Sequence, residues 1–569
     1  MLVAVVVDED GRGRLQPLTD RGSPAGPVEQ VGDVAAAVAD RERRDRPRWL
    51  WASTATSYPP LVRAGVRVER CHDLELTEAL LLGYAGRWGE PRSLAAAWAR
   101  LTGAPVPADP APQPATPPGA AQGTLFESRP APGTGVDPLR ALIEVYRDQQ
   151  ARIGATEHPS RFRLLVAAES AGALAAVEMS ADGLPWRADV HDALLVDLLG
   201  QPSPVGGPPR KLAELAGQIG EAFGLRQFHP ESPAEVRRAF ARAGIHLPST
   251  RAWVLREVDH PAVPLLLRYK ELYRIWTAYG WAWLATWVRD GRFRPEYVPA
   301  GVVSGRWATR GGGALQIPKI IRRAAVADPG WRLVVADAGQ LEPRVLAAVS
   351  GDTRLATAAA SGDLYAALAR DAFDGDRGQA KLALLGAMYG QTGGAAIPAL
   401  AVLRRVYPTA LAYLEAAART GEAGGLVRSW LGRTCPPASV GPVTDGADSA
   451  DDRSVTRGRA AARARGRFTR NFVIQATAAE WALTLLATLR AALADTDAQL
   501  VFFQHDEVLV HCPAERAGMV VDLIRDAGVR ASRLLFGDTP VRFPLDVSVV
   551  DCYQQCSGPK AEGDADSPV

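Results

Sequence analysis

The clearest pattern of apolar and polar positions lies at residues 500–512, which read LVFFQHDEVLVHC. An apolar run rich in β-branched and aromatic residues is followed by a short polar turn and a second apolar run. This pattern predicts a strand, a sharp turn and a second strand. The turn presents two adjacent carboxylates, Asp506 and Glu507. Such a hairpin tip suits a bound cation, and it equally suits an acidic turn that is simply solvated.

A second predicted strand also ends in a carboxylate. Residues 331–337 (WRLVVAD) have the pattern of a buried strand that ends at Asp337, and a helix is predicted to follow. Two carboxylates about 4 Å apart repel each other by about 4 kcal/mol at an effective dielectric constant of about 20. If the two strands are neighbours, Asp337 and Asp506 must therefore share cations, or one of them must have a shifted pKa. Ligand sets made only of oxygen suit Mg²⁺.

Residues 351–424 have a helical pattern that contains one regular stripe. Arg377, Lys381, Leu385 and Tyr389 follow one another at every fourth position. Each step of four rotates about 40° around an α-helix, so these side chains lie along one slowly turning line. The line suits a triphosphate at its cationic end and a sugar and base at the other. A solvated cationic stripe with a packed tyrosine is the alternative interpretation.

Two further stretches have the chemistry of nucleic-acid contacts. Residues 302–325 are basic and rich in glycine, which suits a loop along a phosphate backbone. A helix predicted over residues 467–483 carries a polar stripe that suits base edges in a minor groove, although solvation explains it equally well. This stripe consists of Arg467, Asn471 and Gln475.

The remaining chain divides by composition. Residues 1–103 contain a predicted strand that ends in a turn at 2–13, a second strand at 46–53 and two helices near the end, which is α/β in character. Residues 104–137 are rich in Pro, Ala and Gly and predict a semi-extended linker. Residues 138–288 are mainly helical, and the stretch 265–288 predicts one long helix. Polar residues 438–460 predict a flexible excursion, and the tail 557–569 is expected to be disordered.

Composition excludes several classes of protein. Hydrophobic residues make up 47% and charged residues 22% of the chain, as in ordinary soluble proteins. The five scattered cysteines predict reduced thiols and no structural metal site. We find neither a leader pattern nor an apolar run of about 20 residues, so we expect a cytoplasmic protein without a membrane partner. The formal net charge of +2 neither supports nor excludes nucleic-acid binding.

Five motifs, in this order, resemble those of the family-A DNA polymerases, the bacterial DNA polymerase I group. SGRWATRGGGALQIP is similar to the template-contact loop, and WRLVVADAGQLEPRVLA to the motif with the first catalytic Asp. RGQAKLALLGAMYG resembles the nucleotide-binding fingers helix, and RNFVIQATAAE and QHDEV resemble the remaining palm motifs. The resemblance implies an α+β polymerase domain at 138–556 with an antiparallel β palm and mostly helical thumb and fingers. The thumb is expected at about 190–290, the palm at about 300–350 and 425–556, and the fingers at about 351–424.

The resemblance also implies an activity, a cofactor and partners. It predicts DNA-templated addition of dNTPs to the 3′-hydroxyl of a primer–template DNA, in replication or repair, by a monomer in the bacterial cytosol. Two Mg²⁺ ions, with Mn²⁺ as a substitute, are expected on Asp337, Asp506 and the Ala338 carbonyl. The catalytic residues would be Asp337, Asp506, Glu507 and Lys381. Nucleotide binding is assigned to Arg377, Lys381, Leu385, Tyr389, Glu342 and Gln340, and DNA binding to Arg306, Arg467, Asn471, Gln475, Gln504 and His505.

This chain departs from the family pattern at several of these positions. Leu385 stands where the family has a Phe or Tyr that stacks on the sugar. Ala338 and Gly339 replace a Tyr-Ser pair, and the GRRR-like turn is reduced to residues 432–434. Glu342 matches the residue that closes the space below the sugar 2′ position, so selection of deoxynucleotides is expected.

The N-terminal region, residues 1–103, faintly resembles the ribonuclease H-like 3′–5′ exonuclease domain through LVRAGVRVERCHDLELTEALL. The first strand lacks an Asp-x-Glu, and residues 53–57 (STATS) replace the expected Asn-x-x-x-Asp. We therefore expect proofreading to be lost. The alternatives are a bifunctional exonuclease and polymerase, a catalytically weak DNA-binding scaffold, and template-directed RNA synthesis, which Glu342 disfavours.

Overall fold

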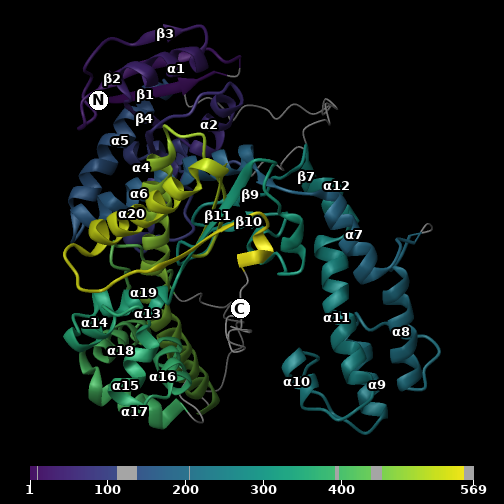
Figure 1. Cartoon of the computed structure of the whole chain (residues 1–569). Coiled ribbons are helices and arrows are strands. Elements are labelled where there is room, and N and C mark those ends of the chain that lie inside the picture. Colours follow the sequence, from purple (N-terminus) through teal and green to yellow (C-terminus); the bar gives the residue numbers. More distant parts are fainter. Residues whose placement is uncertain (9, 112–136, 204–205, 391–395, 438–451, 557–569) are drawn as a thin grey trace. The chain divides into compact units, whose positions relative to one another are not determined.

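The computed structural model describes residues 1–569 except 9, 112–136, 204–205, 391–395, 438–451 and 557–569. The described chain forms two compact units (Figure 1). The first contains Met1–Ala181, Tyr297–Ala308 and Val334–Ser548, and the second contains Asp182–Glu296, Thr309–Leu333 and Val549–Val569. Most of the predicted linker, part of the predicted excursion and the whole tail lie outside the described residues.

The first unit opens with a five-stranded sheet in the order β3-β2-β1-β4-β5. Its strands are β1 (Leu2–Val7), β2 (Gly13–Leu18), β3 (Glu29–Val31), β4 (Arg48–Trp51) and β5 (Arg70–Asp73). Strand β1 runs antiparallel to β2 and parallel to β4, and β4 runs parallel to β5. The predicted strands at β1 and β4 are confirmed, whereas β2 and β3 were not predicted.

This sheet is buried on both faces. Val3 and Val5 of β1 pack in one hydrophobic cluster, whereas Leu2 and Ala4 pack in another, because successive side chains of a strand point to opposite faces. The covering helices are α1 (Val34–Asp45), α2 (Thr54–Arg63), α3 (Leu74–Tyr84), α4 (Leu94–Thr102), α5 (Pro138–Gly154) and α6 (Pro159–Asp182). Helices α3 and α4 match the two predicted by the sequence.

A second sheet carries the predicted hairpin. Its order is β12-β13-β11-β14, from the strands β11 (Trp331–Ala338), β12 (Gln499–Gln504), β13 (Glu507–Pro513) and β14 (Leu545–Val550). Strands β12 and β13 are antiparallel, which confirms the strand, turn and strand predicted at residues 500–512. Val334 and Val510 from this sheet share one core with Leu485 of α19 (Asp452–Leu493) and Ile524 of α20 (Ala517–Phe536).

Helices follow β11 along the chain. They are α13 (Leu341–Val349), α14 (Thr353–Ala358), α15 (Leu364–Ala372), α16 (Arg377–Tyr389), α17 (Ala396–Val406) and α18 (Pro408–Glu422). Helix α18 packs along α19. Because α19 begins at Asp452, the prediction of a flexible excursion is wrong for residues 452–460, which form the first part of this helix.

The second unit is mainly helical. It contains α7 (Ala188–Leu199), α8 (Arg210–Ala222), α9 (Pro233–Arg242), α10 (Ala252–Arg256), α11 (Ala262–Tyr279) and α12 (Trp281–Trp287). It also holds a small sheet of β6 (Leu184–Pro185), β8 (Arg292–Phe293) and β7 (Val288–Arg289). A separate two-stranded sheet consists of β9 (Glu296–Val298) and β10 (Ala308–Arg310). Among the described residues, 3₁₀ turns lie at Ala314–Gln316, Ile321–Ala324, Ala514–Arg516 and Tyr553–Cys556.

The prediction of a single long helix at 265–288 is wrong, because the helix is interrupted at Gly280. A Cβ at this position would lie 2.2 Å from the carbonyl oxygen of Trp276, so only glycine fits the break. Helix α11 ends before it and α12 starts after it.

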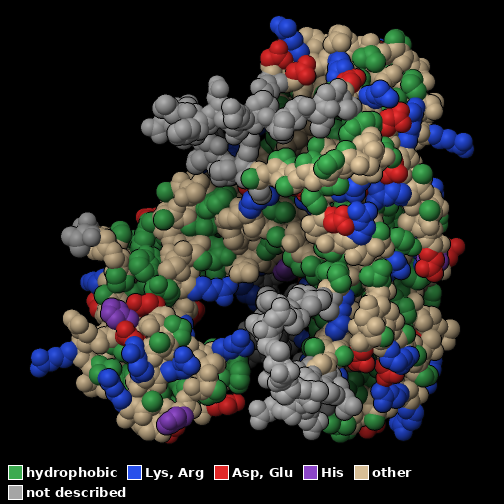
Figure 2. Space-filling model, turned by 180° about the vertical axis from the view of Figure 1, so that it is seen from behind, with side chains coloured by type: hydrophobic (Ala, Val, Ile, Leu, Met, Phe, Trp, Pro, Cys, Tyr) green, Lys and Arg blue, Asp and Glu red, His purple; other side chains and the backbone are tan. Residues whose placement is uncertain are grey.

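Two helices in the described residues are long and apolar enough to cross a membrane. They are Pro159–Asp182 and the segment Ala460–Leu493, and 67% and 83% of their most apolar windows are buried inside the protein. Packing in the core therefore accounts for their apolar character. Figure 2 shows basic and acidic side chains interspersed on the face drawn, in keeping with a formal net charge of only +2.

Candidate active site

Two strand-end carboxylates meet on the second sheet. Asp337 is the penultimate residue of β11, and Asp506 lies in the two-residue turn between β12 and β13. Because β11 and β13 are neighbours, the N–H of Ala338 donates a hydrogen bond of 3.2 Å to the carbonyl oxygen of Asp506. Burial and the charge of Asp337 raise the pKa of Asp506 to about 7, against an opposing effect of Arg306. The structure thus brings together the two residues that the sequence singled out.

The turn that presents Asp506 is a tight one. Gln504 pairs with Glu507 across the hairpin, which leaves His505 and Asp506 as the loop. His505 has φ of 58°, a left-handed conformation that costs a non-glycine residue about 1 kcal/mol or more. Partial burial and the nearby Arg306 lower the pKa of His505, which favours the neutral imidazole.

Glu342 connects three separate elements at this site. It lies in the first turn of α13, and its Oε1 accepts a hydrogen bond of 2.7 Å from Nη2 of Arg306. Its Oε2 accepts a hydrogen bond of 2.8 Å from the hydroxyl of Tyr389, at the end of α16. Burial and the charge of Glu342 raise the pKa of that hydroxyl. The Glu342 side chain is only 12% exposed, so its charge is compensated by Arg306 rather than by water.

Helix α16 carries the predicted stripe over its whole length. The helix starts at Arg377, where the side chain of Asp376 caps it by accepting from the N–H of Gln379 at 2.9 Å. Arg377 is exposed and Lys381 is half-buried, whereas Leu385 packs partly against the large core. Tyr389 ends the helix and contacts Glu342, so the stripe leads from a cationic start to the site of Glu342.

The polar stripe of α19 lies on one helix as predicted. Arg467 is exposed, and Asn471 and Gln475 are half-buried. The Oδ1 atom of Asn471 is buried and has no hydrogen-bond partner among the described residues. Gly390, which follows α16, lies against Arg467, since a Cβ there would approach the Arg467 Cγ to 2.9 Å. The stripe therefore begins beside the end of α16.

The remaining predicted site residue, Gln340, precedes α13 with φ of 57°. Its Oε1 accepts a hydrogen bond of 2.8 Å from the N–H of Leu364, and its Nε2 donates one of 2.7 Å to Asp363. Sequence reasoning missed Asp363, although an acidic residue directly before a helical pattern is a signal for a helix cap.

The carboxylates of the N-terminal sheet have structural partners. Asp73 is buried, caps α3 through the N–H of Leu76 at 2.9 Å, and accepts from the N–H of Thr54 at 2.7 Å. Burial raises the pKa of Asp73 despite these hydrogen bonds. Asp10 pairs with Arg12 at the surface. In the part of the chain that the structure describes, no group of three or more His, Cys, Asp or Glu side chains has an arrangement that could hold a metal.

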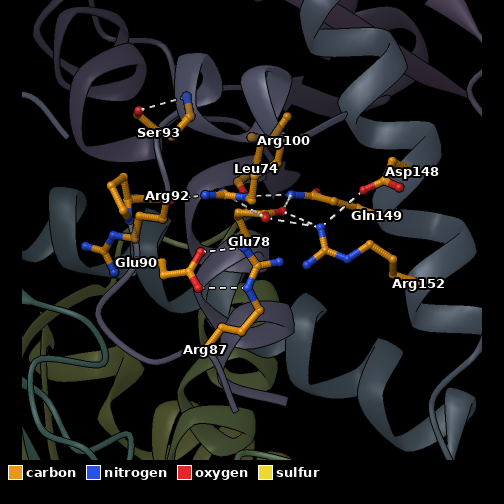
Figure 3. Close-up of polar contacts among 12 residues, drawn as sticks. Leu74, Glu78, Arg87, Glu90, Arg92, Ser93, Arg100, Asp148, Gln149 and Arg152 are labelled. Carbon is orange, nitrogen blue, oxygen red and sulfur yellow. Dashed lines mark hydrogen bonds and ion pairs between the residues drawn. The ribbon is translucent and has the colours of Figure 1, made fainter. Parts of the chain in front are cut away.

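The charge of another buried carboxylate in this region, Glu78, is compensated by arginine side chains (Figure 3). It is fully buried and accepts hydrogen bonds from Arg100 at 3.0 Å, from Arg152 at 3.0 and 3.1 Å, and from Gln149 at 3.1 Å. Two guanidinium groups on one carboxylate indicate a structural cluster. The cluster connects α3 and α4 with α5 by hydrogen bonds. The sequence pattern did not indicate this connection.

The family model for DNA polymerase family A matches residues 209–551, which is more than half of the chain. The chain belongs to this family.

Several curated relatives are DNA polymerases. The thermostable DNA polymerase I of Thermus thermophilus is 28% identical over 330 residues, which are 53% of this chain and 37% of the relative. The DNA polymerase I of Chloroflexus aurantiacus is 29% identical over 310 residues, 49% of this chain and 31% of the relative. The matched part thus spans about a third of the length of these relatives.

One solved structure covers nearly the whole chain. It is described as the POL domain of Pol1 from M. smegmatis in complex with DNA primer-template and dNTP. It matches 97% of this chain and 95% of its own length with a TM-score of 0.67 and 18% sequence identity. At this identity the match shows that the fold is shared.

Proposed function

We propose that this chain is a DNA-templated DNA polymerase that adds deoxynucleotides to the 3′-hydroxyl of a primer. The observation that carries the proposal is the meeting of Asp337 and Asp506 on adjacent strands of a family-A chain. The similar fold solved with primer-template and dNTP supports the same substrates.

The donor set at the two aspartates fits divalent cations. The pKa of Asp506 is raised to about 7 by burial and by Asp337, so a cation would relieve the repulsion between the two carboxylates. Asp337, Asp506 and the Ala338 carbonyl would supply oxygen ligands only, as Mg²⁺ prefers, with Glu507 beside them. When bound, two Mg²⁺ ions lower the pKa of the primer hydroxyl and neutralise the triphosphate and the leaving pyrophosphate.

The stripe of α16 would bind the incoming nucleotide. Arg377 and Lys381 would contact the triphosphate, where Arg presents a planar fork and Lys a compact charge. Lys381 would also give a proton to the leaving pyrophosphate. Leu385 would lie against the sugar, and Tyr389 under the templating base pair. Gln340 would support this site from the start of α13.

Glu342 would exclude ribonucleotides. Its two oxygen atoms are held by Arg306 and Tyr389, so the carboxylate cannot easily turn away from a 2′-hydroxyl. A ribose hydroxyl would then meet side-chain bulk and a carboxylate that already has its partners. The primer-terminal minor groove would be contacted by Arg306, Arg467, Asn471, Gln475, Gln504 and His505.

We also propose that the N-terminal sheet domain has no proofreading activity. Its strand order and parallel β1-β4 pair support the likeness to an exonuclease domain. Asp73 and Glu78, the fully buried carboxylates named above, cap a helix or pair with arginines. The chemistry of excision requires several carboxylates around two metal ions, and these two carboxylates already have partners within the protein.

A primer-extension assay with labelled dNTPs on a primed template tests the polymerase proposal. Wild type should extend the primer in the presence of Mg²⁺, Asp506→Ala should lose at least about 10³-fold in rate, and Asp10→Ala, an exposed control, should match wild type. Absence of extension by wild type, or full activity of Asp506→Ala, would overturn the proposal.

The same gel, run with a mismatched primer and no dNTP, tests the loss of proofreading. The primer should keep its length over the time in which wild type completes extension. Shortening of the primer that persists in Asp337→Ala would show an active exonuclease.

A further inference from the structure

Asp363 lies between the strand-end site and the start of helix α16. Its Oδ1 accepts hydrogen bonds from Nε2 of Gln340 at 2.7 Å and from the N–H of Ala366 at 3.1 Å. Its Oδ2 accepts a charge-assisted hydrogen bond of 2.9 Å from Nε of Arg377. The two oxygen atoms of the Asp363 carboxylate thus make different contacts. Oδ1 caps α15 and contacts Gln340, and Oδ2 contacts Arg377.

The contact made by Arg377 leaves its phosphate-binding atoms available. Only Nε is engaged by Asp363, and Nη1 and Nη2 make no hydrogen bond with the described residues. The guanidinium carbon also lies 5.6 Å from the centre of the Tyr365 ring, within the range of a cation–π contact. Arg377 is therefore held from two sides, with the terminal fork that matches a phosphate left free.

Gln340 is fixed in turn. Its Oε1 accepts from the N–H of Leu364 at 2.8 Å and from Nη2 of Arg344 at 3.3 Å. Arg344 is fully buried and donates to five backbone carbonyls, those of Gly339, Ala359, Ser361, Gly362 and Arg542, at 2.6 to 3.2 Å. Asp363 is therefore held in place through Gln340 and the buried Arg344, although Arg377 itself is exposed.

We propose that Asp363 is a positioning residue that orients Arg377 for the triphosphate of the incoming nucleotide. The inference rests on the proposed polymerase function and deepens it, because it adds a residue that contacts neither the nucleotide nor the metals. Asp363 sets the direction of the Arg377 fork and links it, through Gln340, to the turn that follows Asp337.

The direction in which nucleotide binding changes when Asp363 is replaced distinguishes an orienting role from a purely electrostatic one. Removal of a negative charge near a triphosphate should by itself strengthen nucleotide binding. Loss of an orienting contact should weaken it, because Arg377 would then have to be ordered when the nucleotide binds.

Asp363→Asn isolates the contact. The Asn Oδ1 can keep its bonds to Ala366 and Gln340, and Asn caps a helix as well as Asp does. The amide NH₂ would replace Oδ2 and face the Nε–H of Arg377, so two donors would oppose each other. Asp363→Ser is a second variant that keeps the cap but is too short to reach Arg377. Asp376→Asn is the matched control, because it removes a neighbouring helix-capping charge and leaves the Asp363 contact intact.

The experiment measures KM for each dNTP, kcat and inhibition by inorganic pyrophosphate on a primed template, together with thermal melting. For Asp363→Asn and Asp363→Ser we expect KM to rise about tenfold for all four dNTPs, and pyrophosphate inhibition to weaken by a similar factor. We expect kcat to change by less than about threefold, with wild-type melting temperatures and Asp376→Asn close to wild type.

An unchanged or lower KM in Asp363→Asn would overturn the proposal, and so would an equal rise in Asp376→Asn. If the wild-type enzyme failed to extend a primer, the proposed function itself would be rejected. These two failures are therefore distinguishable in one set of assays.

Discussion

The backbone of Ala338 donates a hydrogen bond of 3.2 Å to the backbone carbonyl of Asp506. This bond joins the residue after Asp337 directly to the second aspartate, across strands that are far apart in the sequence. It holds the backbone of the two segments that carry the aspartates side by side. The strain of His505 in the same turn is one cost of presenting Asp506 in this way.

The first prediction concerns stability and pH in the absence of metal. Burial and Asp337 raise the pKa of Asp506 from 3.8 to about 7, so the folded state holds this proton more tightly than the unfolded chain does. The resulting stability is complete below pH of about 4 and is lost as the pH rises through about 7, by at most about 4 kcal/mol.

Melting curves in EDTA between pH 4 and 8 measure this effect. Asp506→Asn should lack this part of the pH dependence, so the wild-type melting temperature should fall relative to the variant as the pH rises. Because Glu480 also has a pKa raised to about 7 by burial, only the difference between the two proteins is diagnostic. Parallel curves for both proteins would contradict the prediction, and Mg²⁺ should narrow the difference.

The second prediction concerns Glu342 and sugar selection. Glu342→Ala should reduce the preference for dNTPs over rNTPs, measured as a ratio of kcat/KM, on the order of tenfold or more, because the space below the 2′ position opens. Tyr389→Phe keeps the ring but removes the hydrogen bond to Glu342, so it should cause a smaller loss of selectivity. Equal selectivity in all three proteins would show that Glu342 does not contact the sugar.

The third prediction concerns Leu385, which packs partly against the core of the first unit. An aromatic ring at this position would offer the sugar a larger and more rigid face than leucine does. Leu385→Tyr should therefore change the ratio of ddTTP to dTTP incorporation in a primer-extension assay by about tenfold. A ratio that does not change would refute a contact between residue 385 and the sugar.

The fourth prediction concerns the buried ion pair between α6 and α19. Arg490 donates to Glu178 of α6 at 2.8 Å and to the backbone carbonyl of Glu69 at 2.8 Å, and Tyr58 also donates to Glu178. Arg490→Met would leave the charge of Glu178, which is only 8% exposed, without its partner. We expect a loss of about 3 to 5 kcal/mol in the free energy of unfolding.

A surface ion pair provides the control for this prediction. Arg43 and Asp40 are 71% and 52% exposed, so Arg43→Met should cost less than about 0.5 kcal/mol. Chemical denaturation of both variants measures the difference. A small cost for Arg490→Met would contradict a stabilising role for this buried pair.

Elements with a strong period of apolar residues could be predicted from the sequence. Residues 500–512 and 331–337 contain apolar runs because their strands are buried in one sheet. The stripe of α16 is visible because the core side of this helix is taken by other residues, among them Leu384 and Met388. By contrast, β2 contains Gly13 and Pro17 and offers no such pattern, although its pairing with β1 makes it a strand.

Long-range polar pairs could not be predicted in the same way. Glu169 and Arg433 are 264 residues apart and Glu178 and Arg490 are 312 apart, yet both pairs are buried. From the sequence alone, each of these charged residues would be expected at the surface. The role of Asp363 is hidden for the same reason, because its partners Gln340 and Arg377 come together only in the fold.

The central claim, that Asp337 and Asp506 share divalent cations, is tested most directly by counting bound Mn²⁺ ions by electron paramagnetic resonance. The sample is the complex of the full chain with a dideoxy-terminated primer–template and the next dNTP. The account predicts two tightly bound Mn²⁺ ions per wild-type complex and loss of tight binding of at least one in each of Asp337→Asn and Asp506→Asn. Unchanged Mn²⁺ binding in both variants would contradict it.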